Sequence, residues 1–322
     1  MPTVTTQRWV TDGLAIAKYL DNMGYRSELQ YADDNVATQI SQIDAMLSHG
    51  AKLLVVAPID GKQLGVILKK AADKNVKVIS YDRLIRDSAN VDYYATFDNY
   101  YVGVLQGTDI VKRLGLGTGK GPFKIEIFAG DPDDNNSTFF YNGAMAQLKP
   151  YINQGRLVVG SGQVSFESVS TPRWNGANAR IRLEKVLERF YINQRLDAVL
   201  APNDGIAVEL IVALKNAGYG LGSKQAMPVI TGQDADMQSV RSIIRREQTS
   251  TVFKDTRVLA QVTATMADAI LSGKSPKIND EKTYHNGVKL VPSHLLQPVG
   301  VDLDNWRTLL VDSGYYKAHK LK

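Results

Sequence analysis

The sequence contains no cysteine among its 322 residues. This absence excludes disulfide bonds, thiolate metal ligands and cysteine nucleophiles. Long apolar runs are missing too, since no stretch reaches the roughly 20 residues that a membrane-spanning helix needs. The first residues, MPTVTTQRW, have neither the basic start nor the apolar core of a signal peptide. Taken alone, they favour a cytoplasmic location.

Motifs for several other chemistries are also lacking. The four histidines show no metal-ligand spacing, and no G-x-S-x-G motif occurs. The stretch GLGTGKG (115–121) follows a predicted helix, and glycine rather than serine or threonine comes after its lysine, so it is not a phosphate-binding loop. No helix-turn-helix precedes the first strands, and the net charge of +5 comes without a basic block. We therefore expect no cofactor, metal or nucleic acid.

Short apolar stretches alternate with amphipathic ones along the chain. Strands are predicted over 27–33, 51–58, 76–82, 93–98, 123–130, 156–163, 197–202, 227–234 and 249–255, with strand character at 287–301. Helices are predicted over 10–25, 37–50, 61–75, 101–115, 137–154, 176–192, 205–217, 237–247, 256–273 and near 304–314. Such alternation is typical of parallel sheets flanked by helices, and two consecutive passes of it indicate two similar lobes.

Polar side chains follow most of the predicted strands. Asp82 and Arg83 follow one strand, and Gln233 and Asp234 follow another. The same kind of position is held by the stretch DPDDNNST (131–138), Asp98, Asn99, Asn203, Asp204, Lys254 and Asp255. Ligands of open parallel sheets bind at the carboxyl ends of the strands, so these side chains are candidates for a binding site. A turn or a helix cap is the simpler role for any one of them, and we expect it for Asp98 and Asp255.

These residue types suit a sugar ligand. A carboxylate accepts hydrogen bonds from two neighbouring hydroxyls, whereas an amide or a guanidinium donates to hydroxyl or ring oxygens. The face of a tryptophan stacks on the apolar C–H patch of a pyranose. Each half of the chain also holds one arginine–tryptophan pair, Arg8 with Trp9 and Arg173 with Trp174.

Six segments in register carry a family resemblance. They are YDRLIRD (81–87), YYATFDNYYVGVLQ (93–106), PDDNN (132–136), GAMAQLKPYI (143–152), GQDAD (232–236) and VFKDTRVLA (252–260). Together they resemble the periplasmic binding proteins for pentoses and hexoses, of the multiple-sugar-binding and xylose-binding type, over the whole chain. These are substrate-binding components of ABC transporters. The resemblance implies the type I fold, an α/β architecture of two Rossmann-like lobes with parallel sheets joined by a three-segment hinge.

The resemblance also implies discontinuous lobes. The N-terminal lobe would comprise residues 1–98 and 254–290, and the C-terminal lobe residues 99–253 and 291–322, with crossings near 98–102, 250–256 and 288–294. Members have a short strand that ends in MPT, whereas here Met1 is the methionine of that MPT. We therefore expect that the first strand of the N-terminal lobe and the signal peptide are missing from this chain, and that the protein is periplasmic.

Binding roles follow from the resemblance, position by position. In the N-terminal lobe the matching residues are Arg8, Trp9 as a stacking ring, Asp82 and Arg83. In the C-terminal lobe they are Asn136, Arg173, Trp174, Asn203, Asp234 and Lys254. Within DPDDNNST only Asn136 is expected to reach the ligand, while Asp133 and Asp134 shape and cap the turn. Residues 117–124 lack the alternating oxygen ligands of the calcium loop in galactose-binding members, so we expect no calcium.

The predicted function is non-catalytic binding of a monosaccharide, an aldopentose, an aldohexose or an acid derivative. The lobes would close on the sugar like a clam and deliver it to an ABC permease, to a membrane sensor for chemotaxis or signalling, or to both. We expect a monomer. Three alternatives stay open: a sensing domain for signalling only, a binder of another small polar molecule such as a furanose signal, and a sugar-acting enzyme that uses Asp82 and Asp234.

Overall fold

The computed structural model describes residues 1–220, 222–223 and 225–321. The chain forms two compact units, and it passes from one to the other after Asp98, Lys254 and Gln297. Unit 1 comprises Met1–Asp98 and Asp255–Gln297, and unit 2 comprises Asn99–Lys254 and Pro298–Lys322. In the described part of the chain, no helix combines the length and the apolar character needed to cross a membrane.

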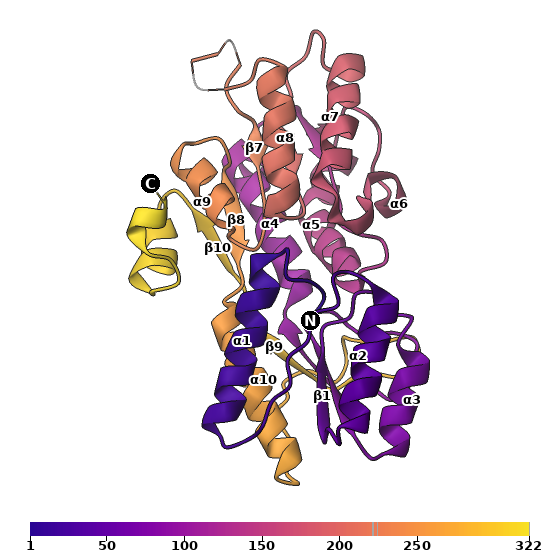
Figure 1. Cartoon of the computed structure of the whole chain (residues 1–322). Coiled ribbons are helices and arrows are strands. Elements are labelled where there is room, and N and C mark those ends of the chain that lie inside the picture. The colour runs from indigo at the N-terminus through magenta and orange to yellow at the C-terminus, as the bar shows by residue number, and fades with distance from the viewer. Residues whose placement is uncertain (221, 224, 322) are drawn as a thin grey trace. The chain divides into compact units, whose positions relative to one another are not determined.

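Unit 1 is built on a sheet of parallel strands in the order β1-β2-β3-β9. Its elements are α1 (Gln7–Asn22), α2 (Val36–Ser48), β1 (Leu53–Val56), α3 (Gly65–Asp73), β2 (Lys77–Tyr81), β3 (Tyr93–Phe97), α10 (Thr256–Leu271) and β9 (Ser293–Leu296). Helices α1 and α10 lie side by side, although more than two hundred residues separate them in sequence (Figure 1). Their apolar faces pack with Ile79, Tyr81, Ala95 and Phe97 of the sheet. This burial fixes the start of α1 close to the ends of β2 and β3.

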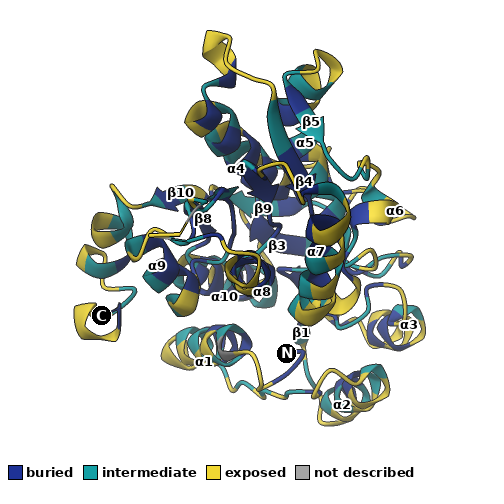
Figure 2. Cartoon of the chain, turned by 90° about the horizontal axis from the view of Figure 1, so that it is seen from above, coloured by how far each residue is buried: buried dark blue, intermediate teal, exposed yellow. Residues whose placement is uncertain are grey.

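Unit 2 repeats this plan with a parallel sheet in the order β5-β4-β6-β7. Its first elements are α4 (Asn99–Leu114), η1 (Leu116–Thr118), β4 (Phe123–Ile127), α5 (Asn135–Asn153), β5 (Leu157–Val159), α6 (Phe166–Val169) and η2 (Pro172–Trp174). There follow α7 (Gly176–Phe190), β6 (Ala198–Leu200), α8 (Asp204–Asn216), β7 (Val229–Ile230), α9 (Met237–Ile244), β8 (Ser250–Phe253), β10 (Val299–Asp302), η3 (Arg307–Asp312) and η4 (Ala318–Leu321). Strands β3 and β4 are largely buried, whereas the outer faces of α2, α3 and α7 are exposed (Figure 2). This is the expected pattern for sheets covered by helices.

The structure differs from the sequence expectations at three places. Residues 25–32 form no strand, although 27–33 were predicted as one. Their hydrogen bonds to Met1, through Gln30 and Ala32, are too few for a strand ladder. The last crossing follows Gln297 rather than lying within 288–294, and residues 291–297 belong to unit 1, because β9 pairs with β3. Strand β8 pairs antiparallel with β10, because the chain re-enters unit 2 at Pro298 and runs back along it.

Helices α4 and α5 of unit 2 approach each other through glycines. A Cβ built on Gly103 would lie 1.9 Å from the carbonyl oxygen of Phe140, and one on Gly143 would lie 2.0 Å from that of Tyr100. No real Cβ fits at such distances, so the two backbones can touch only where side chains are absent. The glycines thereby bring the start of α5, with its polar residues, close to α4.

We expect Gly103→Ala to lower the free energy of unfolding by about 1–3 kcal/mol, because the added methyl overpacks the contact between α4 and α5. In an exposed helix the same change would raise the free energy of unfolding by roughly 1 kcal/mol. The sign of the measured change therefore shows whether the contact is overpacked. Urea titration followed by circular dichroism measures the effect. Gly117→Ala is the matched control in unit 2, since nothing lies within 4 Å of its Cβ. Equal stability of the two variants would contradict the packing argument.

Candidate functional site

The first polar cluster lies in unit 1, where α1 begins and β2 ends. We define it by the predicted residues Arg8, Trp9, Asp82 and Arg83. Nη2 of Arg8 donates to Oδ2 of Asp82, and the guanidinium carbons of Arg8 and Arg83 lie 5.0 and 5.3 Å from the centre of the Trp9 ring. The fold therefore brings all four residues together. Trp9 packs against both guanidinium groups, a contact that the sequence did not reveal beside its predicted stacking role.

The carboxylate of Asp82 is held by its backbone. Its φ is +62°, a left-handed value that aspartate tolerates better than most residues. Its amide donates to the carbonyl of Ala95 over 2.8 Å, and its carbonyl accepts from Tyr94 Oη over 2.6 Å and Thr96 Oγ1 over 2.9 Å. These bonds from β3 fix the turn, so the carboxylate projects from a rigid position at the sheet edge.

Sequence reasoning missed Asp12, which lies behind Arg8 one turn along α1. Its Oδ2 is 3.7 Å from Nε of Arg8 and accepts a 2.9 Å hydrogen bond from the hydroxyl of Tyr81. Asp12 is only 1% exposed, so a group on the ligand side cannot reach it easily. It sets the orientation of Arg8 from behind, while Asp82 holds the other end of the guanidinium. The i,i+4 spacing to Arg8 was the signal that could have found it.

The second polar cluster lies in unit 2, and we define it by Asn136, Arg173, Trp174, Asn203, Asp234 and Lys254. Buried Lys254 follows β8, and its Nζ lies 2.9 Å from Oδ1 of Asp234, which follows β7. The same Nζ sits 5.5 Å from the ring centre of Phe140, and that ring meets Trp174 edge-on at 6.3 Å. Phe140 thus links the ion pair to the tryptophan. It stands four residues after Asn136 on α5, and sequence reasoning did not select it.

The ring of Trp174 lies over the end of β4. A Cβ on Gly130 would come within 2.0 Å of the indole, so only glycine fits there. Its Nε1 donates to Oδ2 of Asp134 over 3.3 Å, and Oδ1 of Asp134 accepts from the amide of Asn136 over 3.0 Å. The predicted capping role of Asp134 is therefore confirmed, and this residue also positions the tryptophan. Arg173 precedes Trp174 and is exposed.

Helix capping accounts for part of the polar residues after strands. Asp255 caps α10 by accepting from the amide of Arg257, as expected. Oδ1 of Asn203 caps α8 by accepting from the amide of Ile206, which leaves its Nδ2 to donate elsewhere. The buried Asn136 accepts through Oδ1 from Nδ2 of Asn99 over 3.0 Å. Both asparagines thus make structural hydrogen bonds within unit 2.

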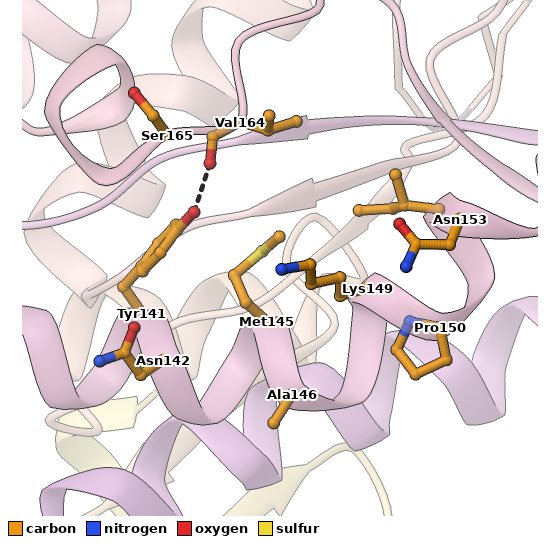
Figure 3. A pocket seen from close by; sticks show the side chains of 10 residues that line it. Tyr141, Asn142, Met145, Ala146, Lys149, Pro150, Asn153, Val164 and Ser165 are labelled. Atoms are coloured by element: carbon orange, nitrogen blue, oxygen red, sulfur yellow. Dashed lines mark hydrogen bonds between the residues drawn. The ribbon is translucent and has the colours of Figure 1, made fainter.

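A groove of about 850 Å³ lies elsewhere in unit 2, along the outer side of α5. Figure 3 shows Tyr141, Met145 and Lys149 facing Val164 across it, with the hydroxyl of Tyr141 donating to the carbonyl of Val164. None of the residues that line this groove belongs to either polar cluster. Among the described residues, no three of histidine, aspartate and glutamate gather closely enough to hold a metal ion. Each cluster is therefore a candidate site within its own unit.

Asp12 should make stability depend on pH. Burial raises its pKa from 3.8 to about 6; the Arg8 charge lowers the pKa, and the Asp82 charge raises it. The folded state therefore binds more protons than the unfolded state between pH 3.8 and about 6. The contribution of Asp12 to the free energy of unfolding is complete below pH 3.8 and is lost as the pH rises to about 6.

Asparagine does not titrate. The free energy of unfolding of Asp12→Asn, relative to that of the wild type, should therefore rise by roughly 3 kcal/mol as the pH increases from 3.8 to about 6. Urea unfolding at a series of pH values measures the difference. The titratable groups near the Asp12 carboxyl are unchanged between the wild type and Asp12→Asn; they are Arg8, Tyr31, Tyr81 and Asp82. The exposed Asp21 on the same helix, changed to Asn, is the control. A pH-independent difference for Asp12→Asn would contradict the assignment.

Comparison with known proteins agrees with this architecture. A family model described as a periplasmic binding protein domain matches residues 1–275. The chain is 56% identical to the multiple sugar-binding periplasmic protein SbpA of Azospirillum brasilense, over 100% of this chain and 90% of that protein. It is 54% identical to the multiple sugar-binding periplasmic receptor ChvE of Rhizobium radiobacter, over 100% of this chain and 91% of that protein.

A solved structure agrees as well. A crystal structure of an ABC transporter solute-binding protein from Clostridium phytofermentans with bound β-D-glucose matches with a TM-score of 0.95 and 48% identity. The match covers 100% of this chain and 98% of that one. Family model, sequence relatives and fold converge, and the chain belongs to the periplasmic binding proteins, with their type I fold.

Proposed function

We propose that the protein binds a monosaccharide, or an acid derivative of one, in the periplasm and without turnover. The observation that carries this proposal is the pairing of a carboxylate with a cation and a tryptophan in each unit. Arg8 and Asp82 form the pair in unit 1, and Lys254 and Asp234 form it in unit 2. Relatives named for sugar binding, and a related structure that holds β-D-glucose, support the ligand class.

The chemistry of each cluster suits a polyhydroxylated ring. A carboxylate can accept several hydrogen bonds, and two vicinal hydroxyls of a sugar match its two oxygens. The partner cation donates to a ring oxygen or to a hydroxyl oxygen, and the nearby indole offers an apolar face to C–H groups. Because Asp82 and Lys254 are each 5% exposed, bonds to them are made largely out of water, where they discriminate between epimers most strongly.

One sugar engaged by both clusters would favour a closed state of the protein. A ligand shifts a conformational equilibrium only by its difference in affinity for the two states, and only closure supplies both sets of contacts. We propose that an ABC permease, a membrane sensor or both recognise that closed state. The names of the relatives, one a receptor, are consistent with either partner.

Asp82→Asn tests the first cluster. Asparagine tolerates the left-handed φ of +62°, so the fold should persist while the charge-assisted bonds are lost. We expect the affinity for the best-bound monosaccharide to fall about 10- to 150-fold, which corresponds to a charged hydrogen bond of 1.5–3 kcal/mol. Titration calorimetry with D-glucose, D-galactose, D-xylose and L-arabinose provides the measurement.

The matched control is Asp87→Asn, another aspartate of unit 1 with a left-handed φ, +54°, but exposed. It should bind like the wild type. Unchanged affinity in Asp82→Asn would remove Asp82 from the site. Failure of the wild type to bind any monosaccharide in the panel would overturn the proposed function.

Tryptophan fluorescence provides an independent test. The chain has three tryptophans, and Trp306 packs instead against an apolar cluster near the C-terminus. We expect saturating sugar to change the emission of the wild type and of Trp306→Phe. The change should be lost in the double variant Trp9→Phe, Trp174→Phe, because ligand contacts and desolvation act on those two rings. A signal that disappears only in Trp306→Phe would place the ligand elsewhere.

A further inference from the structure

Asp204, at the first position of α8, is a fully buried carboxylate that accepts hydrogen bonds from two segments of unit 2, the loop at Asp236 and residues 248–251. Its Oδ1 accepts from Nε2 of Gln248 over 3.0 Å. Its Oδ2 accepts from the amide of Asp236 over 2.7 Å and from Oγ1 of Thr251 over 3.0 Å. Both carboxylate oxygens therefore accept from protein donors.

Both segments, and the start of α8 itself, lie next to residues of the second polar cluster. Asn203 directly precedes Asp204, and the amide of Asp204 donates to the carbonyl of Gln233 over 3.0 Å. Asp234 follows Gln233, two residues before the Asp236 amide that the carboxylate holds. Thr251 belongs to β8, which leads directly to Lys254. Asp204 thus joins the backbones that place Asn203, Asp234 and Lys254.

The loop from Gln233 to Asp236 has a strained backbone that must be fixed by hydrogen bonds. Asp234 has a φ of +94° and Ala235 a φ of +51°, and a left-handed alanine costs about 1–2 kcal/mol. The amide of Ala235 donates to Oγ1 of Thr251 over 3.2 Å, and that hydroxyl in turn donates to Asp204. A Cβ on Gly232 would lie 2.1 Å from Oδ1 of Asp204, so the carboxylate fits closely against the strand end. The hydrogen bonds from Thr251 and Asp204 thus hold the loop in its strained conformation.

The buried position has an energetic cost. Burial, and then the charges of Asp236 and Asp234, raise the pKa of Asp204 well above its ordinary range. Apolar side chains of similar volume often replace buried charges without loss of stability. A carboxylate that served only to fill space would therefore be a poor choice at this position. Its value lies in the geometry that its three bonds impose on the loop and on β8.

We propose that Asp204 is a positioning residue, which fixes Asp234 and Lys254 in the arrangement that binds the ligand. The proposal rests on the sugar-binding function proposed above and adds a residue outside the predicted contact set. Asp204 lies behind the cluster and acts through the loop from Gln233 to Asp236. Its removal should therefore weaken binding by misplacing the ion pair while the rest of unit 2 stays folded.

The test compares Asp204→Asn with Glu126→Gln. In Asp204→Asn an amide NH₂ must face N–H or O–H donors, which breaks at least one of the three bonds. Glu126 is the matched control: it is fully buried in the same unit, and it accepts from the hydroxyl of Tyr191 over 2.7 Å and from the amide and hydroxyl of Ser161 over 2.9 and 2.6 Å. None of its partners belongs to the second cluster. Both variants thus lose one buried carboxylate with a similar number of bonds.

Hydrogen exchange on the ligand-free proteins is the first measurement. We expect the amides of Asp234, Ala235 and Asp236 to exchange at least about tenfold faster in Asp204→Asn and at the wild-type rate in Glu126→Gln. Unchanged exchange in Asp204→Asn would overturn the proposal. This readout needs no sugar, so it decides the role of Asp204 in the loop even if the proposed function itself fails.

Calorimetry with the best-bound sugar of the panel is the second measurement. The affinity should fall at least about tenfold in Asp204→Asn and less than about twofold in Glu126→Gln. In an Asp234→Asn background, adding Asp204→Asn should change the affinity by less than about threefold, because its target is already lost. The proposal would be contradicted if Asp204→Asn bound with wild-type affinity, or if Asp204→Asn and Glu126→Gln lost the same affinity. It would also be contradicted if Asp204→Asn weakened binding as much in the Asp234→Asn background as in the wild type.

Thr251→Val covers the case in which Asp204→Asn does not fold. The change preserves the shape of the side chain and removes one donor to Asp204 together with the acceptor for the Ala235 amide. It should accelerate exchange at Ala235 and weaken sugar binding by an intermediate factor of about three to ten. A folded Thr251→Val with normal exchange and normal affinity would overturn the proposal on its own.

Discussion

Parallel pairing is the constraint from which the candidate site follows. In each of the two main sheets the strands run in one direction, so all loops after the strands emerge at the same edge. Residues far apart in sequence then become neighbours: Asp82 follows β2, and Arg8 lies in the first turn of the helix that packs over β2 and β3. In unit 2 the same constraint brings the ends of β4 and β7 to one edge, and the hydrogen bond from the amide of Asp234 to the carbonyl of Val252 holds β8 beside the loop that follows β7. The sheets convert a scattered pattern into two compact groups of polar side chains.

A second row of side chains holds the first row in place. Asp12 stands behind Arg8, Asp134 behind Trp174 and Asn136, and Asp204 behind the loop that carries Asp234. Each of these carboxylates accepts from groups of the protein, so the side chains of the two clusters that they contact have little conformational freedom left to lose. Backbone strain at Asp82 and Asp234 fits the same picture, because left-handed positions persist only where neighbouring bonds fix them. The order of the two clusters therefore depends largely on residues that stand behind them.

Much of the fold was predictable from the sequence because hydrophobic periodicity reports burial directly. The strand at 51–58 is apolar and closed by proline, and β1 (Leu53–Val56) lies within it. The alternating stretch 27–33 was misassigned, since alternation gives a strand only where a partner completes the ladder. Among the site residues, Asp12 and Phe140 each lie one helical turn after a selected residue. Their roles depend on which strand the helix covers, and periodicity does not carry that information.

The sequence by itself determined the order of strands and helices, the polar residues at the strand ends and the family. These properties are local, or are carried by contiguous motifs such as GQDAD (232–236). Only the tertiary structure decided which polar residues contact each other, which serve as caps and which carboxylates are buried. Asp204 shows the reason: its partners Gln248, Thr251 and Asp236 lie more than thirty residues away, and only the folding of unit 2 brings them to its two oxygens.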